Sequence, residues 1–122
     1  MTSILWRILM SVLCVGLILF AAAQYNDPDP QIWGAMYGVG AIWTGLAVFA
    51  PRLISGRAAT LLLLLSVILA ICAVVYFWPP RPNWWVQEVW WRDEEAREGM
   101  GMMILATCIA LVGGYRFLSR KA

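Results

Sequence analysis

Four long apolar stretches constrain this chain more than any other feature of its sequence. They cover residues 4–23, 31–50, 58–78 and 99–117. About 20 helical residues cross the ~30 Å hydrocarbon core of a bilayer, so each stretch is long enough for one span. The stretches are apolar all round, as in LLLLLSVILAICAVVYF, whereas helices of soluble proteins are apolar along one stripe. We therefore expect an all-α integral membrane four-helix bundle, with residues 1–122 forming a single four-span domain.

The composition agrees with a membrane protein and excludes several functions. Charged residues make up 13% of the chain, against about 25% in typical soluble domains. The chain has no histidine, which removes the commonest general base and excludes haem ligation through imidazole by this chain alone. Its net charge is +2 without a run of Lys and Arg, so no nucleic-acid partner is expected. Cys14, Cys72 and Cys108 all fall inside apolar stretches, which favours packing over reactivity.

The first apolar stretch also has the features of a secretory signal. Arg7 precedes the apolar run, and Ala21, Ala22 and Ala23 follow it. Cleavage and retention are therefore both open. Retention is favoured, because the run is longer than the apolar region of a usual signal and a second span follows at once.

Charge predicts the orientation of the four spans. All acidic residues fall at one end of the predicted bundle, together with Arg81, Arg92 and Arg97. The other basic residues fall at the end that holds both termini, and they are Arg7, Arg52, Arg57, Arg116, Arg120 and Lys121. Because positive loops stay inside, we expect the N- and C-termini to be cytoplasmic and the membrane to be the bacterial inner membrane.

Tryptophan is concentrated between spans three and four, in the segment NWWVQEVWWRDEE. Tryptophan often forms a belt at the membrane–water boundary, which is the simplest interpretation of this outward-facing loop. The density exceeds what anchoring requires, so a short interfacial helix or a lid over the outer ends of the spans is an alternative.

Small residues recur at helical spacing on the second and fourth spans. Such stripes let helix backbones approach closely in lipid. They indicate either packing within the bundle or a face that docks a partner, and the candidates are Gly34, Gly38, Gly45, Ala106, Ala110 and Gly114.

The segment QYNDPDPQIW between the first two spans is unusually polar for its position. A structural interpretation covers most of it. Asp29 before Pro30 is typical of a helix N-cap followed by the first helical residue. Asn26 can end the first helix in a left-handed conformation, and Asp27 before Pro28 favours an extended turn. The structural interpretation accounts less well for Asp27 than for the other residues.

A second acidic segment, RDEEAREGMG, begins at Arg92 and opens the fourth span. Its first carboxylates suit the positive end of a helix that starts near Asp93, and Asp93 can pair with Arg97 four residues later. Glu98 lies a turn deeper, where a carboxylate is costly unless it is paired or faces a polar cavity. Glu94 and Glu98 share a face, and so do Trp33 and Tyr37 on the second span.

These two segments together resemble the transmembrane protein 220 family of small four-span membrane proteins. The resemblance covers the whole order of spans, although the tryptophan-dense loop is not expected in every member. It implies the four-span architecture and a set of residues, and it implies no particular reaction. The matching residues are Asn26, Asp27, Pro28, Asp29, Trp33, Tyr37, Glu94, Arg97, Glu98 and Gly101.

The first functional hypothesis is a ligand site at the outer face. Hard oxygen ligands suit Ca²⁺ or Mg²⁺, with Asp27, Glu94 and Glu98 as metal candidates. Tryptophan faces attract organic cations, and a lipid headgroup would engage both charges. Arg97 opposes a metal, and it can instead clamp Asp27 or Glu98 in an ion pair. The full candidate set is Asn26, Asp27, Asp29, Trp33, Tyr37, Glu94, Arg97 and Glu98.

Two other hypotheses stay open. The protein can be an accessory or assembly subunit of a larger membrane complex or a homo-oligomer, with the acidic and arginine residues as a structural clasp. It can also be an enzyme or transporter, for which Glu98 and Tyr37 are the pair to test. A non-enzymatic role is favoured, because the sequence marks no nucleophile with its base and no broken span.

Overall fold

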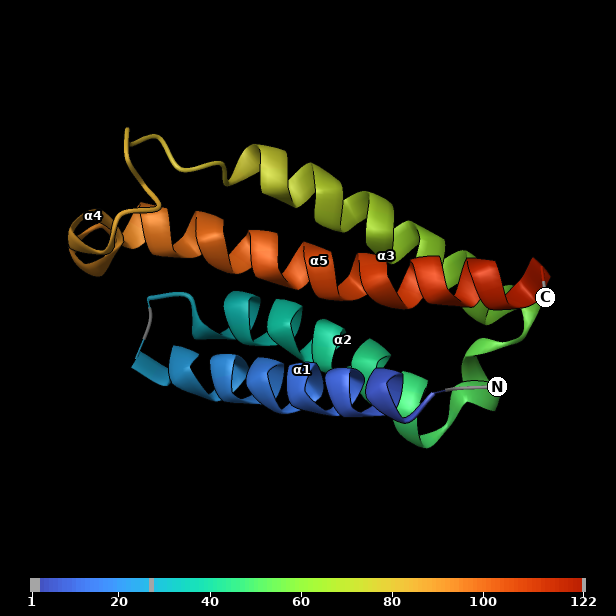
Figure 1. The fold of residues 1–122 in the computed structure, drawn as a ribbon. Helices are drawn as coiled ribbons and strands as arrows, with labels where there is room; N and C mark the ends of the chain where they lie inside the picture. The colour runs from blue at the N-terminus through green and yellow to red at the C-terminus, as the bar shows by residue number, and fades with distance from the viewer. Residues whose placement is uncertain (1–2, 27, 122) are drawn as a thin grey trace.

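All the regular elements are helices in the part of the chain that the structure describes, which is residues 3–26 and 28–121 of a computed structural model (Figure 1). This confirms the predicted all-α fold. In chain order, the elements are α1 (Ile4–Ala22), the 3-10 helix η1 (Ala23–Asn26), α2 (Pro30–Phe49), the 3-10 helix η2 (Pro51–Ile54), α3 (Arg57–Tyr76), the short helix α4 (Gln87–Arg92) and α5 (Glu94–Lys121).

Four of these helices are long and apolar enough to cross a membrane, as predicted. The candidate spans are Ile4–Tyr25, Pro30–Phe49, Arg57–Tyr76 and Glu94–Leu118. The last helix begins at Glu94, earlier than the apolar run at residue 99, because carboxylates are favourable in the first turn of a helix. The tryptophan-rich segment between the third and fourth spans contains α4, so the predicted short helix is present.

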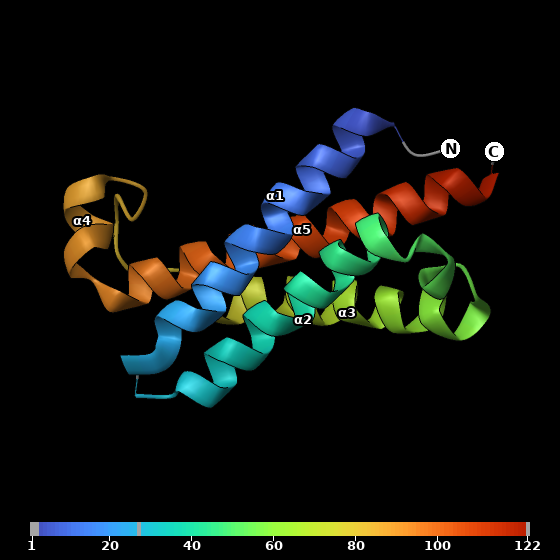
Figure 2. The ribbon, with the colours of Figure 1, turned by 90° about the horizontal axis from the view of Figure 1, so that it is seen from below.

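The four long helices form two pairs. Helix α1 packs along α2, α3 packs along α5, and α2 contacts α5 where the pairs meet. Figures 1 and 2 show the α1–α2 pair lying across one side of the α3–α5 pair. The α2–α5 contact therefore holds the two halves of the bundle together.

The two ends of the bundle differ in chemistry. Both termini lie at one end, and the α1–α2 turn and α4 lie at the other (Figure 1). At the end with the termini, Trp6 of α1 stacks on Tyr115 of α5 with ring centroids 4.1 Å apart. Arg116 donates hydrogen bonds to the carbonyl oxygens of Ile54 and Ser55, at 2.9 and 2.5 Å. These contacts tie the α2–α3 connection to α5.

Large apolar side chains stay exposed along α1 and α3. Ile18 on α1 and Leu62 on α3 are more than half exposed, as are many of their neighbours. A monomeric protein in water rarely exposes a continuous apolar surface of this extent. The exposure is what a bilayer requires, and the closely packed core lies where α2 and α5 meet the other two helices.

The structure changes the prediction about small residues. Gly34 and Gly45 approach α1, where added Cβ atoms would lie 3.8 Å from the Ala21 carbonyl oxygen and 3.4 Å from the Cys14 sulfur. Ala106 is half-buried against the core. By contrast, Gly38 and Gly114 have open space beside them and Ala110 is exposed, so packing within the bundle does not explain these three. Docking of a partner on them stays a prediction.

The tightest contacts at glycines occur outside the predicted stripes, at Gly40, Gly99 and Gly101. A Cβ on Gly99 would lie 2.5 Å from the carbonyl oxygen of Phe77 and 2.6 Å from the Pro79 ring. A Cβ on Gly101 would overlap the hydroxyl of Tyr37, and one on Gly40 would overlap Leu105. These glycines allow α5 to lie directly against the end of α3 and against α2.

We expect Gly99→Ala to lower the free energy of unfolding by about 1–2 kcal/mol. Overpacking costs about 1–3 kcal/mol, and the higher helix propensity of alanine offsets up to about 1 kcal/mol of this. Gly114→Ala on the same helix is the matched control, because its Cβ meets open space. The measurement is thermal unfolding of both variants in one detergent. Equal unfolding temperatures would contradict the close contact between α5 and the end of α3.

Candidate functional site

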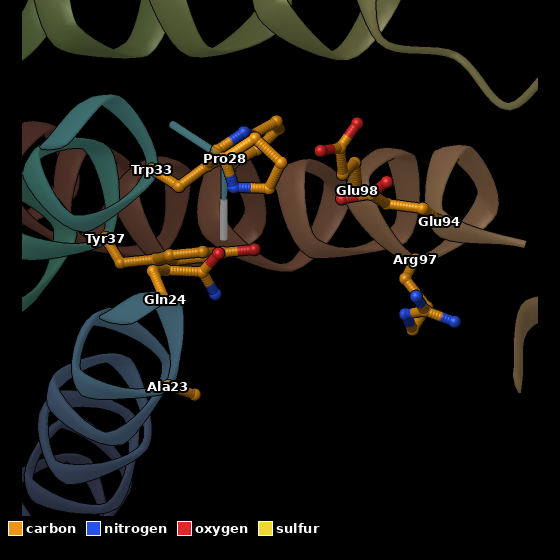
Figure 3. Close-up of a pocket in the computed structure, with 8 residues that line it drawn as sticks. All are labelled: Ala23, Gln24, Pro28, Trp33, Tyr37, Glu94, Arg97 and Glu98. Atoms are coloured by element: carbon orange, nitrogen blue, oxygen red, sulfur yellow. The ribbon is translucent and has the colours of Figure 1, made fainter. Parts of the chain in front are cut away.

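A pocket of about 450 Å³ lies at the end of the bundle opposite the termini (Figure 3). It brings together the two polar segments that the sequence singled out, one from the α1–α2 turn and one from the start of α5. Trp33 and Tyr37 come from α2, and Glu94, Arg97 and Glu98 come from α5. Ala23, Gln24 and Pro28 complete the lining.

Five of the eight predicted site residues therefore line one pocket: Trp33, Tyr37, Glu94, Arg97 and Glu98. Asp29 is exposed at the start of α2 and does not line the pocket. Asp27 and the side chain of Asn26 lie outside the described residues, so their predicted roles stay predictions. The pocket adds Gln24 and Pro28, which stand within the polar segment but carry no charge that would have marked them.

The α1–α2 turn departs in two details from its prediction. Asp29 occupies the N-cap position of α2 and Pro30 follows it as expected, but the Asp29 side chain makes no capping hydrogen bond. Its backbone (φ −122°, ψ 60°) differs from the extended conformation usual at an N-cap. Asn26 ends the 3-10 helix η1, so it does not close α1 in a left-handed conformation.

The carboxylates around the start of α5 divide into two groups. The first group, Asp93 and Glu95, forms ion pairs with Arg81. The Arg81 Nε lies 3.6 Å from Asp93 Oδ2, and its Nη2 lies 3.3 Å from Glu95 Oε1. Glu94 and Glu98 form the second group and line the pocket. Ala96, which lies between Glu94 and Glu98 in the sequence, is completely buried. The face of α5 that carries Ala96 therefore packs against the rest of the protein. Glu94 and Glu98 are four residues apart and share one face of α5, which directs both to the pocket. Asp93 precedes α5, so it and Glu95 meet Arg81 from different positions.

Arg97 makes different contacts from those predicted. The expected ion pair with Asp93 is wrong, because Asp93 pairs with Arg81. Arg97 is exposed, and its Nη1 donates to the carbonyl oxygens of Trp90 and Trp91, at 2.9 and 2.7 Å, so it does not form the expected buried pair with Glu98. The alternative clamp on Asp27 falls outside the described residues. Carbonyls at the end of a helix are natural partners for a cation. Arg97 therefore holds α4 beside the pocket.

Two buried aromatic rings form the opposite wall of the pocket. Trp33 and Tyr37 are each 5% exposed. Phe77 supports Trp33 with ring centroids 5.0 Å apart, and Phe20 supports Tyr37 edge-on at 5.4 Å. The Tyr37 hydroxyl sits against Gly101, where there is no room for a side chain. The aromatic wall is therefore packed against α1, α5 and the residue that follows α3.

The pocket combines two carboxylates and one guanidinium with aromatic rings. In Figure 3 the guanidinium of Arg97 points away from the carboxylate of Glu98, so the two charges face different parts of the pocket. Within the described residues, no group of three His, Cys, Asp or Glu side chains is placed to hold a metal ion. Of the three predicted metal ligands, Glu94 and Glu98 lie in the pocket and Asp27 is outside the described residues. Glu98 and Tyr37, the pair predicted for acid–base chemistry, both line it.

The fold and the pocket together define an integral membrane protein with four candidate spans and a polar cavity at one end. A family model described as "Transmembrane family 220, helix" matches residues 16–113, so the chain belongs to this family and the predicted resemblance is confirmed. Comparisons with curated proteins and with solved structures give no match.

We expect Arg97→Met to loosen α4 while leaving the long helices intact. The variant loses two hydrogen bonds to carbonyl oxygens. The expected cost is about 1 kcal/mol, below the ~1.5–3 kcal/mol of a typical charged hydrogen bond, because Arg97 is exposed to solvent. Hydrogen exchange of the amides of α4 should become faster.

Arg92→Met is the control for this measurement. Arg92 is also exposed, and the described residues show no hydrogen bond from its side chain. Equal exchange rates in the two variants would mean that Arg97 does not hold α4.

Proposed function

We propose that the protein is a non-enzymatic membrane protein that binds a ligand bearing an organic ammonium group in this pocket. The observation that carries the proposal is the placement of Glu94 and Glu98 opposite the rings of Trp33 and Tyr37. Carboxylates attract an ammonium group, and the faces of tryptophan and tyrosine favour it further once water is excluded. A soluble amine and a lipid headgroup both carry this chemistry.

Arg97 extends the same proposal to zwitterions. A guanidinium is suited to phosphate, and this one lies at the pocket beside two acids that would hold an amine. A phosphoethanolamine or phosphocholine group carries both charges within a few bonds. Such a group matches the two carboxylates and the guanidinium better than a bare metal ion does, since a neighbouring cation opposes metal binding.

The main test is thermal unfolding of the purified protein with and without glycerophosphoethanolamine. A ligand at 100 times its dissociation constant adds about 2.7 kcal/mol to the free energy of unfolding. We expect this gain to disappear in Glu98→Gln and to persist in Glu95→Gln. Glu95 is the matched control, because it lies three residues away and pairs with Arg81 outside the pocket.

Unfolding with Ca²⁺ or Mg²⁺ tests the competing interpretation, in which the pocket is a metal site. If either ion stabilises the protein, and Glu98→Gln abolishes the effect while glycerophosphoethanolamine has none, the pocket is a metal site. If no probe stabilises the protein and Glu98→Gln melts early, the acidic residues serve the fold.

The second candidate function is an accessory subunit whose acidic and arginine residues act as a clasp. The contacts of Arg97 with α4 and of Tyr37 with Gly101 favour it, since both hold elements together. This candidate predicts that the protein co-purifies with a larger membrane complex in mild detergent. Ala110→Leu, on an exposed face, should then break the association without unfolding the protein.

We also propose that the pocket lies on the outer side of a bacterial inner membrane. Its support is the position of Arg116, which binds the α2–α3 connection at the end that holds the termini. We expect a fluorescent protein fused to the C-terminus to fold and fluoresce. We also expect alkaline phosphatase inserted after Asn83, in the loop before α4, to be active. The reverse pattern would invert the topology.

A further inference from the structure

A second cavity lies within the membrane-spanning part of the bundle, between α2 and α3. It is a groove of about 280 Å³ with an apolar lining. Met36 and Val39 form its α2 side, Leu69 and Ala73 its α3 side, and Met102 and Leu105 of α5 its floor. Helices α2 and α3 are not among the closely packed pairs, which leaves this face of the bundle open to lipid.

Two side-chain contacts of α2, one with Phe77 just after α3 and one with Ser66 of α3, mark the two ends of the groove. At the end near the polar pocket, the Trp33 ring meets Phe77 with centroids 5.0 Å apart. At the other end, Trp43 Nε1 donates to Ser66 Oγ at 3.1 Å. The stretch of α2 between these two tryptophans is about 15 Å long at a rise of 1.5 Å per residue. The groove is therefore a bounded window of a length suited to part of a hydrocarbon chain.

The groove and the polar pocket lie along one stripe of α5. Glu94 and Glu98 line the pocket, and Met102, Leu105 and Ile109 line the groove. Steps of three and four residues keep all five on one face of the helix. Trp33 lies between the two cavities, because it lines the pocket and contacts Phe77 at the neighbouring end of the groove. Along this stripe, acidic residues are followed by apolar residues. A membrane lipid has the same order, with a polar headgroup followed by apolar chains.

A third cavity, between α1 and α5, does not share this arrangement. It is lined by Leu13 of α1 and by Met103, Thr107 and Leu111 of α5, among others. These α5 residues lie on a different face from Glu94 and Glu98 by their helical spacing. Alignment with Glu94 and Glu98 on one face of α5 is therefore specific to the α2–α3 groove.

We propose that the ligand of the polar pocket is a membrane lipid, held with its amine-bearing headgroup at Glu94 and Glu98 and with one acyl chain in the α2–α3 groove. The proposal rests on the proposed function and names the source of the ammonium group. A lipid is the occupant that fits, because the groove opens into the bilayer and contacts a chain by dispersion alone. The tether between chain and headgroup raises the concentration of the headgroup at the pocket.

The test compares dioleoyl phosphatidylethanolamine, which has headgroup and chains, with glycerophosphoethanolamine, which has the headgroup alone. Affinities of the protein (residues 1–122) are measured by native mass spectrometry in detergent. A lipid also concentrates in the micelle, so the discriminating quantity is the effect of a substitution in the groove. Ala73→Leu fills the groove, and Cys72→Leu adds similar bulk at a neighbouring exposed position.

We expect Ala73→Leu to weaken phosphatidylethanolamine binding at least about fivefold, the effect of overpacking by one side chain, and to leave glycerophosphoethanolamine binding unchanged. Cys72→Leu should change neither affinity. Glu98→Gln should weaken both ligands. If Ala73→Leu does not fold, Val39→Phe fills the groove from the α2 side, with Ile42→Phe at an exposed α2 position as its control.

The outcomes separate this proposal from the proposed function. If the headgroup alone binds in a Glu98-dependent way and neither groove variant weakens the lipid, the ligand is a soluble amine and the lipid proposal is overturned. If neither ligand binds, both proposals fail. If dioleoylglycerol, which lacks the phosphoethanolamine group, binds as tightly as the whole lipid, the pocket is not engaged and the lipid proposal is again overturned.

Discussion

The contact between α2 and α5 joins two helix pairs that otherwise share few contacts. It forms where Tyr37 lies against Gly101 and where Leu105 and Leu17 fill the space beside Gly40. In lipid, helices gain little from burying apolar surface against one another, so close approach at small residues supplies much of the attraction. This contact sets the positions of both cavities, because the pocket lies beyond it at one end and the groove lies beside it.

The polar end of the bundle shows how several charges are accommodated near a membrane surface. Arg81 neutralises Asp93 and Glu95, and Arg97 holds α4 through its last carbonyl oxygens. These contacts arrange the loop around the entrance of the pocket and leave Glu94 and Glu98 lining it. Carboxylates attract ammonium groups, so a cationic ligand suits Glu94 and Glu98.

The two cavities together describe an amphiphile more closely than either does alone. The pocket offers acids, a guanidinium and aromatic rings, and the groove is apolar apart from the hydroxyl of Ser66. A ligand with separate polar and apolar parts would use both without a large conformational change, since the aromatic wall is already supported by Phe20 and Phe77. Preorganisation of this kind lowers the cost of ordering side chains on binding.

The sequence by itself determined the all-helical fold and the four candidate spans, and it singled out five residues that line the pocket. It left the short helix among the tryptophans as one of several alternatives. Length, apolar composition and the carboxylates near helix starts act locally or through the bilayer, so they can be read from the chain. Only the tertiary structure decided that Asp93 pairs with Arg81, that Gly99 and Gly101 make the closest contacts, and that the groove lies beside the pocket. These features depend on the rotation of each helix about its axis and on which helices meet, and small residues recur on several faces. A stripe such as that of Ala110 and Gly114 looks the same in sequence whether it faces a neighbouring helix or, as here, the outside of the bundle.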